Sequence, residues 1–152
     1  MNEKMIDELR REIKKDVSRW EEALLEWVYK VGRQVAVVLL KEMDDALMRE
    51  RGEGLKGEGL KVEGCRGRWV MGDMRIERRM YQDEEGEYRY LLDEALGLKK
   101  GCQVSPWLES LATCLASYMP YGKCEEVLGR IVPGGLSHPS LREGPFTAWS
   151  VG

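Results

Sequence analysis

The feature that most constrains the fold is a long apolar stripe in the first third of the chain. Its members are Ile6, Leu9, Ile13, Val17, Trp20, Leu24, Trp27, Val31, Val35 and Val38. Successive members lie three or four residues apart, which is the period of an α-helix, and Glu and Lys occupy much of the opposite face. Residues 3–50 are therefore expected to form one long helix or two joined helices, with a bend at Gly32.

A stripe of this length has two interpretations, and the sequence leaves both open. It packs against the rest of its own chain, or it pairs with a second copy. The stripe does not keep a strict heptad throughout, as a long coiled coil would. Because Trp20 and Trp27 add a large apolar area, we expect this N-terminal helical region to self-associate.

Residues 51–61, with the sequence RGEGLKGEGLK, contain four glycines and are expected to be a flexible linker. Residues 62–98 are expected to form a β-hairpin or meander, because residues 62–92 alternate with the period of a strand. Gly72 and Asp73 are predicted to form a two-residue hairpin turn. In the second strand, one face is expected to carry Met74, Ile76, Arg78 and Met80, and the other Arg75, Glu77, Arg79 and Tyr81.

A second turn is predicted at residues 82–87, where Gly86 is free to adopt a positive φ. A third alternating run, Tyr88, Tyr90 and Leu92, completes a small antiparallel β-meander. Trp69 and Trp107 are expected to be packing residues.

Residues 99–141 are predicted to be helical again. Ser105 and Pro106 are a good N-cap and first helical residue, and residues 119–122 end this helix. A second short helix follows, and Ser137 caps a third that begins at His138. This outline resembles a helix-turn-helix, although many small helical domains share it. Residues 142–152 have no period, so the chain as a whole is expected to be an α+β protein with an aperiodic tail.

Composition excludes several classes of protein. The chain has 152 residues and a formal net charge of −3, so any contact with DNA has to come from a local basic patch. No run approaches the roughly 20 apolar residues of a membrane span. The N-terminus shows no apolar signal core, so we expect a cytoplasmic protein without membrane contact.

Nothing in the sequence predicts a metal, a cofactor or a catalytic group. The four cysteines form no CxxC pair and His138 is the only histidine, so the close ligand pairs of a zinc site are missing. The cysteines are therefore expected to be reduced structural thiols. Residues 83–87 are acidic but belong to an exposed turn, where charges are solvated. Asp93 and Glu94 are expected at the start of a helix.

An arginine-rich segment is the candidate DNA contact. Residues 66–81 hold five arginines against Asp73 and Glu77, a local excess of three positive charges. Arg78 and Arg79 are adjacent on a strand and point to opposite faces. The predicted DNA-binding residues are Arg66, Arg68, Arg75 and Arg79 on the hairpin, with Ser137 and His138 in the third helix. The alternative is an ordinary charged face of a sheet.

The string from Val70 to Leu98 resembles the N-terminal region of the bacterial ISLre-type insertion-sequence transposases. The matching positions are Gly72, Arg78, Arg79, Tyr81, Asp83, Leu91, Leu92, Asp93, Glu94, Leu96 and Gly97. Residues 43–48 upstream, and Ser105-Pro106 and Leu136-Ser137-His138 downstream, also fit. The match rests on an ordered series of motifs across residues 40–138.

The resemblance implies a region that recognises the DNA ends of the element and assembles copies of the enzyme. It also implies that strand transfer belongs to a following RNase-H-like domain, in which three acidic residues hold divalent metal. After His138 the sequence departs from the family pattern, and no such domain follows. We therefore expect a truncated or decayed copy without enzyme activity.

The expected function is that of the N-terminal DNA-binding and assembly region of a transposase-like protein. Its binding to insertion-sequence ends should be weak. Two alternatives remain open. One is a self-associating helical interaction module that does not bind DNA. The other is a remnant with no selected function.

Overall fold

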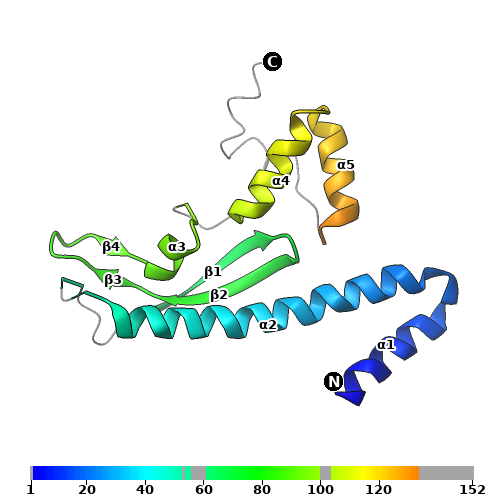
Figure 1. Ribbon diagram of the computed structural model, residues 1–152, viewed down its shortest axis with the longest axis horizontal. Helices are drawn as coiled ribbons and strands as arrows, with labels where there is room; N and C mark the ends of the chain where they lie inside the picture. Colours follow the sequence, from blue (N-terminus) through cyan, green and yellow to red (C-terminus); the bar gives the residue numbers. More distant parts are fainter. Residues whose placement is uncertain (1, 53, 56–60, 100–103, 134–152) are drawn as a thin grey trace.

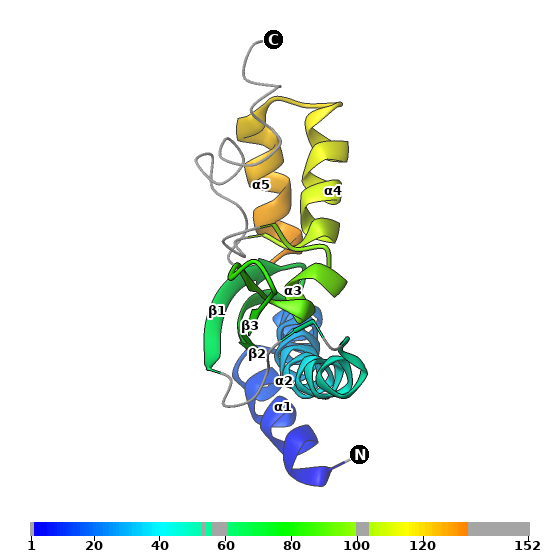
Figure 2. The ribbon, with the colours of Figure 1, turned by 90° about the vertical axis from the view of Figure 1, so that its left-hand side faces the viewer.

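The computed structural model describes residues 2–52, 54–55, 61–99 and 104–133, and it confirms the α+β class. Figures 1 and 2 show three parts, with two β-hairpins and a short helix between a long N-terminal helix and a C-terminal pair of helices. The third predicted helix with Ser137 and His138, and the tail at 142–152, lie outside the described residues. So do residues 53 and 56–60 of the predicted linker.

The N-terminal region forms two joined helices, α1 (Glu3–Lys15) and α2 (Trp20–Glu50), connected by the 3₁₀ turn η1 (Val17–Arg19). The break falls at Asp16, whose backbone is extended and whose carboxylate accepts hydrogen bonds from the Ser18 amide and hydroxyl at 3.1 and 2.6 Å. Helix α2 runs through Gly32 without interruption, so the joint between the two helices does not fall at that position. Gly32 instead allows a close approach, since a Cβ there would lie 2.8 Å from Met71 Sδ.

Helix α1 folds back against the first half of α2. The indole nitrogen of Trp27 donates a hydrogen bond of 3.1 Å to the Met5 carbonyl, and Lys30 forms an ion pair of 2.8 Å with Glu8. Ile6, Leu9 and Ile13 are half-buried. The first part of the apolar stripe therefore lies in an α1–α2 hairpin within the chain.

The larger β-hairpin pairs β1 (Val62–Trp69) with β2 (Gly72–Arg79) in antiparallel register. Its two-residue turn is Val70–Met71, so the prediction of a turn at Gly72–Asp73 is wrong by two residues. Gly72 opens β2 with a φ of 111°. The reason for a glycine there is tertiary: Arg33 of α2 donates to the Met71 carbonyl at 2.6 Å, and its Nη1 would lie 3.0 Å from a Cβ on Gly72.

The alternation predicted for β2 is confirmed along the strand itself, with Met74, Ile76 and Arg78 buried. Ile76 and Cys65 form a small core between the hairpin and the helices, together with Leu40, Trp69, Leu96 and Leu98. The alternation ends with β2 at Arg79, and Tyr81 is fully buried.

The predicted meander is two separate hairpins. Strand β3 (Tyr81–Gln82) pairs only with β4 (Tyr88–Arg89), and the chain then enters helix α3 (Leu91–Ala95). Leu92 is a fully buried residue of α3 and not part of a third strand. The turn between β3 and β4 does have Gly86 at a φ of 84°, as expected.

Two antiparallel helices, α4 (Pro106–Ala116) and α5 (Tyr121–Ile131), form the C-terminal unit of the described chain. Ser105 caps α4 by accepting a hydrogen bond from the Leu108 amide, as predicted. The core of the unit consists of Leu108, Ala112, Cys124, Leu128 and Val132. Trp107 is 74% exposed, so the expectation that it packs is wrong.

Several hydrogen bonds join the C-terminal unit to the rest of the described fold, among them one from Lys99 Nζ to the Glu109 carboxylate at 3.3 Å. The Ser105 amide donates to the Arg68 carbonyl at 2.9 Å, and the Tyr29 hydroxyl of α2 donates to the Ile131 carbonyl at 2.8 Å. Among the described helices, none combines the length and apolar character needed to cross a membrane.

Candidate nucleic-acid interface

The four arginines predicted on the hairpin share one face. In the register of β1 and β2, Arg66 lies opposite Arg75 and Arg68 lies opposite Asp73. Side chains alternate along each strand, so these residues and Arg79 project from the face opposite Ile76. We call this the outer face of the hairpin. Arg78, the fifth arginine, belongs to the buried face.

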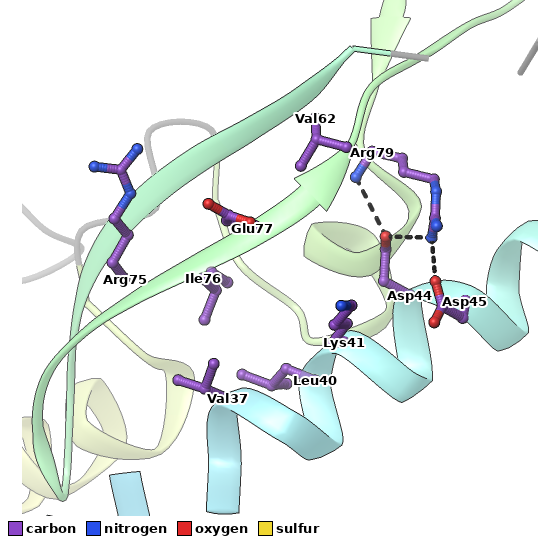
Figure 3. Close-up of a pocket in the computed structure, with 10 residues that line it drawn as sticks. All are labelled: Val37, Leu40, Lys41, Asp44, Asp45, Val62, Arg75, Ile76, Glu77 and Arg79. Atoms are coloured by element: carbon purple, nitrogen blue, oxygen red, sulfur yellow. Dashed lines mark hydrogen bonds and ion pairs between the residues drawn. The ribbon is translucent and has the colours of Figure 1, made fainter. Parts of the chain in front are cut away.

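Two of the four arginines are engaged in ion pairs on this face. The Arg68 guanidinium lies 3.0 Å from the Asp73 carboxylate. Arg79 contacts two carboxylates of α2, with Nη1 at 2.9 Å from Asp44 Oδ2 and 2.6 Å from Asp45 Oδ1 (Figure 3). Arg79 therefore fastens the end of β2 to α2, and its charge is matched inside the protein.

Arg66 and Arg75 are in a different position. Both are exposed, and neither forms an ion pair with a residue that the structure describes. Arg75 extends along the hairpin over Gly64, where a Cβ would lie 2.5 Å from its Nε and Nη2 atoms. In Figure 3 the Arg75 side chain points away from α2, whereas Ile76 points toward Val37 and Leu40. Like charges directly opposite each other destabilise a strand pair, so this position favours an external anion.

A groove of about 470 Å³ runs between α2 and β2 beside the Arg79 ion pairs (Figure 3). Its lining mixes apolar side chains with charges of both signs: Val37, Leu40, Lys41, Asp44, Asp45, Val62, Arg75, Ile76, Glu77 and Arg79. Cations and anions are balanced there. The groove is thus less suited to a phosphate than the outer face around Arg66 and Arg75.

Asp44 lies at the end of this groove and is 4% exposed. Burial raises the pKa of its carboxyl, and the amide and guanidinium of Arg79 act in the opposite direction. The Arg79 amide also contacts Asp44 Oδ1 at 3.4 Å (Figure 3). Asp44 is therefore a buried carboxylate that depends on one arginine for its partner.

Arg78 holds together the opposite, buried face. Its guanidinium pairs with Asp93 at 3.1 Å, donates to the Glu63 carbonyl at 2.9 Å, and lies 4.0 Å from the centre of the Tyr90 ring. The Tyr90 hydroxyl in turn donates to the Glu63 carboxylate. This network joins β1, β2 and α3, so the Arg-Arg and Leu-Leu-Asp-Glu motifs have structural roles at Arg78, Arg79 and Asp93.

The described residues contain no group of three or more His, Cys, Asp or Glu side chains placed to hold a metal ion. Cys65, Cys114 and Cys124 are free thiols, the first and last of them buried. Asp93 and Glu94 lie in the first turn of α3, as predicted. The predicted DNA contacts Ser137 and His138 lie outside the described residues.

Sequence reasoning missed Asp44 and Asp45 as partners of Arg79. Two adjacent acidic residues near the end of a predicted helix were visible, and they fell within the motif series at residues 43–48. Their partner lies 35 residues away from Asp44, beyond the reach of any periodic signal.

The fold and this face define an α+β protein in which a basic hairpin is clamped to a long helix. The model of an uncharacterised protein family (UPF0236) matches residues 14–144, and the chain belongs to that family. The family description names no activity. Neither the comparison with curated proteins nor that with solved structures found a match.

Proposed function

We propose that this chain is the DNA-binding and assembly region of a transposase-like protein, and that it contacts DNA phosphates through the outer face of the β1–β2 hairpin. The observation that carries the proposal is the exposed Arg66–Arg75 pair, neither member of which forms an ion pair with a described residue. Arg68 and Arg79 contribute less, because Asp73 and Asp44 already neutralise them.

The chemistry of the pair suits a phosphate. Directly opposite residues have Cβ atoms roughly 5 Å apart, so a single anion can contact both guanidinium groups and offset their repulsion. Arginine forms paired, charge-assisted hydrogen bonds with phosphate oxygens. Contacts of this kind carry no base information, so binding is weak, sensitive to salt, and similar on insertion-sequence ends and random duplex.

The transposase-like part of the proposal rests on the ordered series of motifs that resembles the ISLre-type transposases. In this proposal the described residues bind and assemble but do not catalyse strand transfer. A protein that acts on the DNA of a bacterial insertion sequence works in the cytoplasm.

A fluorescence-anisotropy titration at several salt concentrations tests the DNA contact. The variant Arg66→Ala with Arg75→Ala should bind both a random duplex and an insertion-sequence end more weakly. The slope of log K against log salt should fall by about two, close to one for each lost phosphate contact. The control is Arg10→Ala with Arg11→Ala, which removes the same charge from exposed positions of α1.

Equal binding by the Arg66/Arg75 variant and the parent chain would refute the proposed contact. Equal losses in both variants would mean that only overall charge matters. A preference for the insertion-sequence end above a hundredfold, about 2.7 kcal/mol, would contradict binding through phosphates alone.

A second candidate function is a self-associating helical module that does not bind DNA. The observation in its favour is the row of exposed apolar side chains on α2, including Val28, Val35 and Val38. This module is compatible with the assembly part of the first proposal. The two differ in whether DNA binds.

A further inference from the structure

Helix α2 carries an apolar seam of which four members are exposed in the described chain and one, Val31, is half-buried. Its five members are Leu24, Val28, Val31, Val35 and Val38, and we call them the outer seam. Their spacing alternates between four and three residues, which is the heptad pattern of helices that pack along each other. Val28, Val35 and Val38 are 48, 50 and 57% exposed.

The outer seam lies on the side of α2 away from the hairpins. Successive residues of a helix are rotated by about 100°, which places Leu40 and Asp44, the residues in contact with the β2 side, roughly opposite Val35. Figure 1 shows both hairpins and the C-terminal helices on one side of α2. The α2 face that packs on the fold is thus separate from the outer seam.

Helix α1 covers a flank of α2 and leaves the outer seam exposed. Its contacts with α2 include the Trp27 indole and the Lys30 ammonium group, which both lie to one side of the outer seam. The two interpretations of the apolar stripe therefore apply to different parts of it. Ile6, Leu9 and Ile13 are half-buried in the structure, and Val28, Val35 and Val38 are not.

We propose that the outer seam binds the outer seam of a second copy of this chain in antiparallel orientation, which deepens the assembly part of the proposed function. Two further exposed side chains of α2, Trp20 and Leu39, extend the contact beyond the outer seam. The exposed apolar surface then consists of Trp20, Leu24, Val28, Val35, Val38 and Leu39. Together with their flanks, two such surfaces bury an area on the order of 1,200 Å², the lower end of the range for stable interfaces.

The charges at the two ends of the outer seam determine the orientation. Glu21 and Glu42 continue the heptad series, one before Leu24 and one after Val38. In a parallel dimer in register, each glutamate would face its own copy, and like charges in a seam are unfavourable. In an antiparallel dimer Val28 faces Val31 and Leu24 faces Val35. Glu21 of one copy then faces Val38 of the other. At this end of the contact the Glu21 carboxylate can reach water.

This arrangement also favours a second copy over an unrelated helix. The aliphatic segment is short and has a glutamate at each end, so an antiparallel copy matches it in length and no glutamate directly faces another. Because the contact uses the same surface on both chains, it closes as a twofold dimer and does not extend into a filament.

Sedimentation equilibrium of the full chain tests the association. The parent protein should be a dimer at tens of micromolar. Val28→Asp with Val35→Asp should raise the dimer dissociation constant more than a hundredfold. The control is Val37→Asp with Val62→Asp, which makes the same charge change at two exposed valines outside the outer seam. It should leave the dimer intact, and circular dichroism should show equal helix content in all three proteins.

A monomeric parent protein overturns the proposal, and so does equal dimerisation of the two double variants. DNA binding is measured separately: Arg66→Ala with Arg75→Ala should remain a dimer. A dimer that does not bind DNA therefore refutes only the hairpin contact, and a monomer that binds DNA refutes only the outer seam.

Disulfide trapping tests the orientation. Glu21→Cys and Val38→Cys are prepared as separate proteins. Each also carries Cys114→Ser, because Cys114 is the exposed thiol among the residues that the structure describes. After mixing and mild oxidation, antiparallel pairing yields cross-links between the two variants and few within either one. Efficient cross-linking of Glu21→Cys to itself would show a parallel dimer and overturn the proposed orientation.

Discussion

Arg79 at the end of β2 and Asp44 in α2 form a largely buried ion pair, with Nη1 2.9 Å from Oδ2. The Asp44 side chain is only 6% exposed and that of Arg79 is 22% exposed. Asp45 provides a second carboxylate for the same guanidinium. The pair closes the fold across 35 residues of sequence. It also explains why an arginine on the outer face is not simply a surface cation.

Arg79→Leu should destabilise the protein by about 3 kcal/mol, because it leaves the buried Asp44 carboxylate without its partner. Urea denaturation monitored by circular dichroism measures this change. Arg10→Leu is the control, since Arg10 pairs with Asp7 at an exposed site where such pairs contribute less than about 1 kcal/mol. Equal effects of the two substitutions would contradict the structural role of Arg79.

The Asp44 carboxyl should titrate above the usual pKa of an aspartate, because burial raises its pKa more than Arg79 lowers it. A raised folded-state pKa means that this group's contribution to stability is greatest below the unfolded pKa. The contribution is lost as pH rises through the folded pKa. Carboxyl-carbon NMR titration measures the value directly.

In Arg79→Leu the pKa of Asp44 should rise further, since the charge and side-chain hydrogen bond are removed while burial remains. Arg68→Leu is the control, because Arg68 pairs with Asp73 and should leave the Asp44 titration unchanged. An Asp44 pKa at or below the ordinary aspartate value in the parent protein would show that the arginine outweighs burial.

Gly72→Ala and Gly122→Ala should change stability in opposite directions. Gly72 has a φ of 111°, and a Cβ there would come within 3.2 Å of Pro133 as well as 3.0 Å of Arg33, so alanine should cost about 1–3 kcal/mol. Gly122 lies in α5 with no atom within 4 Å of an added Cβ, and alanine there should stabilise by about 0.5–1 kcal/mol. Paired thermal or urea unfolding experiments decide both signs.

Much of the local structure could be predicted from the sequence. The helices at both ends, the Ser105 cap, the positive φ of Gly86 and the alternation through Met74, Ile76 and Arg78 were all predicted correctly. Each depends on residues within a few positions of one another, where the period of a helix or strand and the preferences of caps and turns act directly. The sequence also placed Arg75 on the face of β2 opposite Ile76, but its pairing with Arg66 comes from the register of the hairpin.

The tertiary structure decided the features that depend on distant partners. The joint between the two N-terminal helices lies at Asp16, and Met71 packs against Gly32. The turn moved to Val70–Met71 because α2 and Arg33 fix the position of Gly72. Local periodicity determines which face of an element a side chain occupies. Only the packing of α2 against β2 determines that Asp44 and Asp45 neutralise Arg79, while Arg66 and Arg75 remain exposed and form no ion pair with a described residue.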